Sequence, residues 1–212
     1  MPDYRTELTQ YLEEVAVKLL KRIGVNAQSN NKTNITDVDL ITGYGVTIDV
    51  QYSADFAKWG DIRLDIVSAY SVLAEYQTKS RFDLQKLINT DADLQKSESL
   101  VQHLHKFIEI KKSGKLYQSP APDQLFYMVY NHHVKNINDV KNIRPYAVFL
   151  VKTSELTNYL ETNWKTYCSK AECIKLNMKE HLGDKHGSAF FALPLADLLQ
   201  TGFIQKIPLK QH

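Results

Sequence analysis

Two runs of β-forming residues on either side of a glycine-containing loop constrain the fold more than any other feature of this sequence. Residues 37–41 read DVDLI and residues 46–52 read VTIDVQY, and the loop between them, residues 42–45, reads TGYG. Alternating apolar and polar side chains that flank such a loop predict an antiparallel hairpin. The chain is therefore expected to begin its sheet with two neighbouring strands.

The chemistry of the loop predicts the register of this hairpin. If residues 43–45 form a three-residue loop whose last glycine is left-handed, counting outward places Leu40 opposite Ile48. The same count places Asp39 opposite Asp49. A loop one residue shorter or longer would put the two aspartates on opposite faces and mix carboxylates into the aliphatic layer. The segregation of side chains favours the first register.

One face of the predicted hairpin is aliphatic, and the other carries Asp37, Asp39, Asp49 and Gln51. Like charges directly opposite each other destabilise a sheet, so something should offset the repulsion between Asp39 and Asp49. A Mg²⁺ or Mn²⁺ ion suits this position, because Mg²⁺ takes few carboxylates, keeps several waters and leaves room for phosphate oxygens. The competing interpretation is a solvated sheet edge whose acids pair with Arg63 or a lysine.

An amphipathic helix is predicted before the hairpin. Residues 7–23 place apolar side chains at the i, i+3, i+4 and i+7 positions of one helical face. Gly24 suits the C-terminal end of this helix. Glu7 and Glu14 lie seven positions apart on one edge of the apolar stripe.

Together these features resemble the PD-(D/E)XK nuclease superfamily. The resemblance lies in an acid on one strand, an acid-x-polar signature ten positions later on the next strand, and an amphipathic helix before both. Asp39 matches the first acid and Asp49 the second. Gln51 stands where the usual member has lysine, as in some restriction enzymes of the superfamily. Val38 replaces the proline that usually precedes the first acid.

The resemblance implies a restriction-endonuclease-like α/β fold, in which helices flank a central mixed β-sheet. It also implies Mg²⁺- or Mn²⁺-dependent hydrolysis of DNA phosphodiester bonds, with Asp39 and Asp49 as metal ligands and a 3′ hydroxyl and a 5′ phosphate as products. The superfamily's helix often offers a glutamate, and we favour Glu14 over Glu7 for that role.

The glutamine at position 51 leaves the role of the third residue open. Lysine is a point charge that stabilises negative charge on phosphate, whereas glutamine orients water or phosphate through neutral hydrogen bonds. Lys58 is a candidate for the missing cation. For Arg63 a structural salt bridge with Asp65 is the preferred interpretation, and a bidentate phosphate contact is the alternative. Two other functions compete with the nuclease: a nucleic-acid-binding protein without turnover, and an interaction module whose acids only solvate the sheet.

The rest of the chain continues the α/β pattern. We expect one domain over residues 1–212, with a mostly helical insertion at about residues 70–105. The other predicted strands span residues 61–68, 125–130, 147–152, 173–176 and 189–193, and the other helices span residues 155–165 and 195–200. Residues 107–112 and 116–118 are expected to form a hairpin around residues 113–115.

Other motifs carry less information. Cys168, Cys173, His181 and His186 superficially resemble a zinc site, but the inner gap is shorter than in the usual finger, and a strand with a buried thiol is the preferred interpretation. Residues 132–133 are expected to be a solvated histidine pair. The sequence has no glycine-rich phosphate loop and no Gly-x-Ser-x-Gly elbow, which argues against kinases, dinucleotide enzymes and serine hydrolases.

The charge balance, the apolar runs and the cysteines limit the partners and the location expected of this protein. The chain has 26 Lys and Arg residues and 24 acids. This near balance does not indicate a nucleic-acid binder by net charge, so any site for a polyanion must be local. No run approaches the ~18 apolar residues that a membrane span needs. Two closely spaced cysteines and the absence of a secretory leader predict a cytoplasmic location. A homodimer that cuts both DNA strands is left open.

Overall fold

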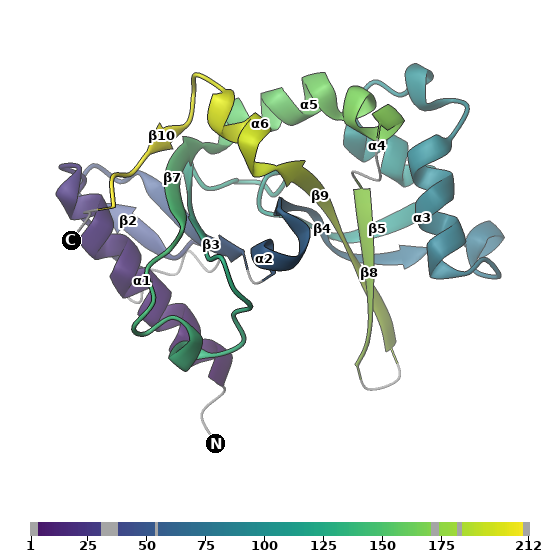
Figure 1. Cartoon of the computed structure of the whole chain (residues 1–212). Coiled ribbons are helices and arrows are strands. Elements are labelled where there is room, and N and C mark those ends of the chain that lie inside the picture. Colours follow the sequence, from purple (N-terminus) through teal and green to yellow (C-terminus); the bar gives the residue numbers. More distant parts are fainter. Residues whose placement is uncertain (1–3, 31–37, 54, 171–173, 182–183, 210–212) are drawn as a thin grey trace. The chain divides into compact units, whose positions relative to one another are not determined.

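The computed structural model describes residues 4–30, 38–53, 55–170, 174–181 and 184–209, which form an α/β protein (Figure 1). Its strands make a six-stranded mixed sheet and a four-stranded antiparallel sheet. Contacts divide the chain into unit 1, residues 1–62, 122–153 and 194–212, and unit 2, residues 63–121 and 154–193. Among the described residues, no helix is both long enough and apolar enough to cross a membrane.

Unit 1 contains the six-stranded sheet, in the order β1-β2-β3-β6-β7-β10. The strands are β1 (Ala27–Ser29), β2 (Leu40–Thr42), β3 (Thr47–Ser53), β6 (Gln124–Val129), β7 (Ala147–Lys152) and β10 (Gln205–Lys206). β3 and β6 are parallel, and the other neighbours are antiparallel. Its other elements are α1 (Tyr4–Arg22), α2 (Phe56–Trp59), η3 (Ile137–Asp139) and α6 (Leu195–Gln200).

Helix α1 covers one face of this sheet and confirms the predicted amphipathic helix. Its buried residues Leu8, Leu12 and Leu19 belong to one core cluster with Ile48 and other sheet residues. Gly24 follows the helix with a φ of +81°, a left-handed conformation that ends helices and that glycine adopts without steric cost.

The hairpin between β2 and β3 has the predicted register. Leu40 pairs with Ile48, and the N–H of Thr42 donates to the carbonyl of Val46 at 2.9 Å. Gly45 has a φ of +80°, as expected for the last residue of a three-residue loop. The first strand is shorter than predicted, because β2 begins at residue 40 rather than 37.

The alternation of β3 separates the candidate site from the α1 core. Ile48 faces the core that α1 covers, so Asp49 and Gln51 point to the other face of the sheet. There Asp49 pairs with Leu125 of β6, and Gln51 pairs with Tyr127. The predicted segregation of aliphatic and polar side chains is therefore confirmed for β3.

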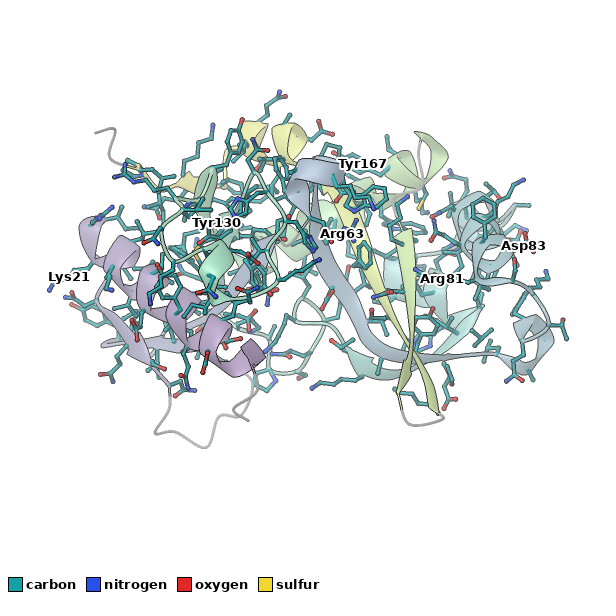
Figure 2. The ribbon with its side chains drawn as sticks, turned by 60° about the horizontal axis from the view of Figure 1, so that its bottom comes forward. Lys21, Arg63, Arg81, Asp83, Tyr130 and Tyr167 are labelled. Atoms are coloured by element: carbon teal, nitrogen blue, oxygen red, sulfur yellow. The ribbon has the colours of Figure 1, made fainter. Side chains whose placement is uncertain are left out.

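Unit 2 contains the four-stranded sheet, in the order β5-β4-β9-β8. Its elements are β4 (Asp61–Val72), η1 (Ala74–Tyr76), α3 (Arg81–Thr90), η2 (Leu94–Lys96), α4 (Leu100–His105), β5 (Ile108–Ser113), α5 (Thr153–Lys170), β8 (Ile174–His181) and β9 (Asp184–Pro194). Two side chains of α3 donate hydrogen bonds to the backbone of β8. The Nε of Arg81 donates to the carbonyl of Leu176 at 2.7 Å (Figure 2). Asn89 donates to the carbonyl of Ile174 at 3.2 Å.

Most predicted elements of the second half are confirmed, including the helical stretch near residues 70–105. The predicted hairpin around residues 113–115 is wrong, because β5 pairs with β4 and residues 115–117 form a turn. The reason is a close backbone approach at Gly114. Its N–H donates to the carbonyl of Ile66 at 2.8 Å, and a Cβ there would lie 2.0 Å from the carbonyl oxygen of Asp65.

Candidate functional site

The hairpin ladder opens at Asp39. One further step of the antiparallel ladder would bring the carbonyl of Val38 to the N–H of Val50. Instead, Oδ2 of Asp39 accepts the hydrogen bond of Val50 N–H at 2.7 Å, and the carbonyl of Val38 accepts from the side chain of Asn30 at 3.1 Å. The Asp39 carboxylate therefore lies against the peptide group that joins Asp49 to Val50.

Asp49 is buried beside this opening. Only 1% of the residue is exposed, although it carries a carboxylate. Gln51 lies two residues further on the same face of β3, and its side-chain amide donates to Oδ2 of Asp49. A buried carboxylate needs such partners, because removing it from water without a hydrogen bond is costly.

Asp39 thus precedes β2 and places its carboxylate on the N–H of Val50, one residue after Asp49, which lies inside β3. Asp37, the third acid of the predicted polar face, lies outside the described residues. Within the described part of the chain, no cluster of three or more Asp, Glu, His or Cys side chains could hold a metal ion. A cation bound by both Asp39 and Asp49 would take its other ligands from water or substrate.

These two carboxylates fit a hard divalent cation. A carboxylate has about four lone-pair positions, and a single N–H donor occupies one of them. Mg²⁺ is usually bound through one or two carboxylates together with waters and phosphate oxygens. The donor set of Asp39 and Asp49 is therefore compatible with Mg²⁺ or Mn²⁺ beside a phosphodiester.

The structure does not support Glu14 as a partner of the aspartates. Glu14 is exposed on α1, which covers the face of the sheet opposite to that of Asp49. Its neighbour Glu13 makes the contact with the sheet, because Oγ of Ser29 donates to Oε2 of Glu13 at 3.0 Å. Burial raises the pKa of Glu13, and the hydrogen bond from Ser29 partly opposes that rise. Glu7, the other helix candidate, is also exposed on α1.

The two predicted cations lie in different units. Lys58 is exposed on α2, with its Nζ 4.4 Å from the ring centroid of Trp59. Arg63 is part of unit 2, where its Cζ lies 4.8 Å from the ring centroid of Phe190 (Figure 2). Lys58 therefore shares unit 1 with the aspartates, whereas Arg63 packs on an aromatic ring of β9.

The histidine pair after β6 is more than a solvated surface. Nε2 of His132 lies 2.6 Å from the carbonyl oxygen of Asp139, and Nδ1 of His133 contacts Oδ1 of Asp55. Two backbone N–H groups hold the pKa of Asp139 below its usual value. Because β3 and β6 are parallel, the segments that follow them meet at one edge of the sheet. His133 is exposed and His132 is half-buried, so the pair is partly solvated, as predicted, and each ring also contacts the protein.

The remaining motif does not form a described site. Cys168 is buried in α5, and Cys173 lies outside the described residues. His181 and His186 lie on β8 and β9, which pair as a hairpin. The preference for a structural role over zinc stays a prediction.

Sequence reasoning missed two residues that shape the site. Asn30 is only 8% exposed and binds the chain on both sides of Asp39: its N–H donates to the Asp39 carbonyl at 2.9 Å and its side chain to Val38. Glu13 connects α1 to β1, the strand that Asn30 follows, through its hydrogen bond from Ser29. Asn30 falls in a polar stretch that gives no strand signal, so no pattern pointed to it. Neither the protein-family models nor the curated proteins compared with this chain give a match.

Proposed function

We propose that this protein is a metal-dependent endonuclease that hydrolyses DNA phosphodiester bonds on a restriction-endonuclease-like fold. Asp39 and Asp49 are the proposed ligands of Mg²⁺ or Mn²⁺. The observation that carries the proposal is the contact of the Asp39 carboxylate with the peptide group of Asp49 and Val50, at 2.7 Å from the N–H. This contact lies one residue from Asp49, at the point where the ladder opens.

Because Asp49 is buried, this pair of carboxylates should attract a cation more strongly than acids at a solvated sheet edge. A carboxylate that is 1% exposed interacts more strongly with a cation than one in bulk water, because little solvent screens it. A divalent cation at this position would supply a more acidic bound water and polarise the phosphate. The hydrogen bond from the N–H of Val50 would hold the Asp39 carboxylate in place, because the backbone of β3 is rigid.

Gln51 is the proposed positioning group. Its amide already donates to Asp49, so it fixes the carboxylate on the face where a phosphate would bind. A neutral amide orients water or phosphate without adding a charge. Lys58 is the proposed source of positive charge in unit 1, and Arg63 is a further candidate for balancing phosphate charge.

Gln51 also favours a second function. Because glutamine replaces the usual lysine, a protein that binds nucleic acid without cutting it is the alternative. It predicts retention of DNA with a steep dependence on salt and no products that require metal. A cytoplasmic location and a homodimer are proposals under both functions.

The decisive experiment is a cleavage assay on plasmid, linear, branched and single-stranded DNA with and without Mg²⁺ or Mn²⁺. The parent should yield products that depend on the metal, and Asp49→Asn should yield none. Glu98→Gln is the matched control, because it removes one exposed carboxylate from unit 2. A parent without products would refute the nuclease and leave the binding protein and the interaction module, and equal cleavage by Asp49→Asn would refute the assignment of the site.

A further inference from the structure

We infer that the aromatic surface after β3 is a stacking platform for unpaired DNA bases. The platform consists of Phe56 and Trp59 of α2, Tyr146 before β7, and Lys58. This inference rests on the proposed function and names its substrate class: DNA with a single-stranded segment. All four residues belong to unit 1, as do Asp39 and Asp49.

The rings are arranged at the surface and not in the core. Phe56 and Tyr146 stack with ring centroids 5.9 Å apart and planes inclined by 23°. Phe56 and Trp59 are three residues apart in one helical turn, so their side chains lie on the same side of α2. Trp59 is 52% exposed and Tyr146 is 63% exposed. Exposed aromatic rings that gather in one place mark interaction sites, whereas single exposed rings need no explanation.

The charges around the platform suit a polyanion. Lys58 holds its ammonium group 4.4 Å from the centroid of the Trp59 ring, where the phosphate of a stacked nucleotide would follow the base. Asp55, the acid that precedes α2, is paired with His133. Asp55 thus has a partner within the protein.

The geometry of DNA makes this surface selective for unpaired bases. In a duplex both faces of an internal base are already covered by its neighbours, so aromatic side chains cannot stack on it without unpairing. Single-stranded DNA offers free base faces, and each base stacked on an aromatic side chain gains affinity whatever its identity. The platform therefore favours single strands, flaps and frayed ends over continuous duplex.

The position of the platform ties it to the candidate site. β3 carries Asp49 and Gln51 and ends at Ser53, and α2 begins at Phe56. At about 3.3 Å per residue, the backbone from Asp49 to Ser53 spans roughly 13 Å. A strand held at the platform would thus have its phosphates a few nucleotides from the aspartates.

The test uses the two tryptophans of the chain, because Trp164 is fully buried and Trp59 is half exposed. Full-length Asp49→Asn protein in EDTA is titrated with oligothymidine and with a blunt duplex, and both fluorescence anisotropy of labelled DNA and tryptophan emission are recorded. Oligothymidine should bind and quench the emission, and Trp59→Ala should weaken binding on the order of tenfold. Trp59→Phe should keep most of the binding and lose the quenching.

Tyr44→Ala and Phe82→Ala are the controls, because they remove exposed rings elsewhere, 98% and 68% exposed. Both should bind oligothymidine like the parent, and circular dichroism should show the parent's melting curve for every variant. Binding without quenching, an equal loss for the Trp59 and control variants, or equal loss on duplex would overturn the platform. If the parent cleaves DNA with metal and Trp59→Ala is equally active, the platform alone is refuted. If binding depends on Trp59 but the parent does not cleave DNA, the nuclease alone is refuted.

Discussion

The carboxylate of Asp39 accepts a hydrogen bond from the backbone N–H of Val50 at 2.7 Å and so replaces the main-chain carbonyl that would continue the ladder. One side chain therefore does two things. It satisfies a backbone donor at the end of the hairpin, and it places a carboxylate next to Asp49. Stability and the proposed metal binding therefore both depend on this residue, and substitutions can separate the two.

Asp39→Ala should lower the free energy of unfolding by about 1–2 kcal/mol, because the partly buried N–H of Val50 loses its acceptor. Asp39→Asn should cost less, since its amide oxygen can accept the same hydrogen bond. Both variants should lose metal-dependent cleavage, because neither supplies a charged ligand. Urea denaturation and the cleavage assay measure the two effects. Cleavage by Asp39→Asn at the parent's rate would show that the residue only closes the hairpin.

The hairpin was predictable because local chemistry determines it. A left-handed glycine at position 45 sets the loop, and the loop sets the register of Leu40 against Ile48. A register shift of one residue would have buried carboxylates in the aliphatic layer, which is costly. These two constraints place Asp39 opposite Asp49, whereas they do not predict the hydrogen bond from Val50 N–H to the Asp39 carboxylate.

Long-range contacts were not predictable in the same way. Gly114 has a backbone contact with β4, so the segment after β5 turns instead of forming a hairpin. Asn30 braces the chain around Asp39 from a polar stretch without strand periodicity. The contribution of Glu13 rather than Glu14 depends on how α1 rotates against β1, because neighbouring helix positions differ by about 100°. A single sequence contains no pattern for these contacts.

Gln51→Lys should retain or increase metal-dependent cleavage, because an ammonium group would add a positive charge next to Asp49 and the phosphate. Gln51→Leu should lose cleavage by at least tenfold and should also lower the free energy of unfolding by about 1–3 kcal/mol, since buried Asp49 would lose a donor. Cleavage rates at saturating Mg²⁺ and urea midpoints check these results. A leucine variant as active and as stable as the parent would remove Gln51 from the site.

Gly114→Ala should destabilise the protein by about 3 kcal/mol or more, because the new methyl group would meet backbone rather than a movable side chain. A Cβ at this position would lie 2.0 Å from the carbonyl oxygen of Asp65 and 2.8 Å from the carbonyl carbon of Ile66. Gly43→Ala is the matched control, since no heavy atom lies within 4 Å of its Cβ position. Chemical denaturation of both variants should show a large loss for Gly114 and a change within about 0.5 kcal/mol for Gly43.

His103 should make the stability of unit 2 depend on pH. The residue is fully buried in α4, and burial lowers its pKa from 6.5, although the Ile88 carbonyl and Asp91 oppose the shift and Lys106 and Lys165 add to it. The unfolded chain then binds more protons than the folded chain below pH 6.5, so stability rises with pH through this range. The stabilisation is fully present above pH 6.5 and is lost as the pH falls toward the lowered folded-state pKa.

The measurement is a series of urea midpoints between pH 5 and pH 8 for the parent, His103→Gln and His105→Gln. His105 is the matched control, because it lies two residues away on the same helix and is exposed. The parent and His105→Gln should both become less stable as the pH falls below 6.5. His103→Gln should show a smaller change over that range, because glutamine takes up no proton. The same pH dependence in all three proteins would mean that burial of His103 does not control the acid sensitivity.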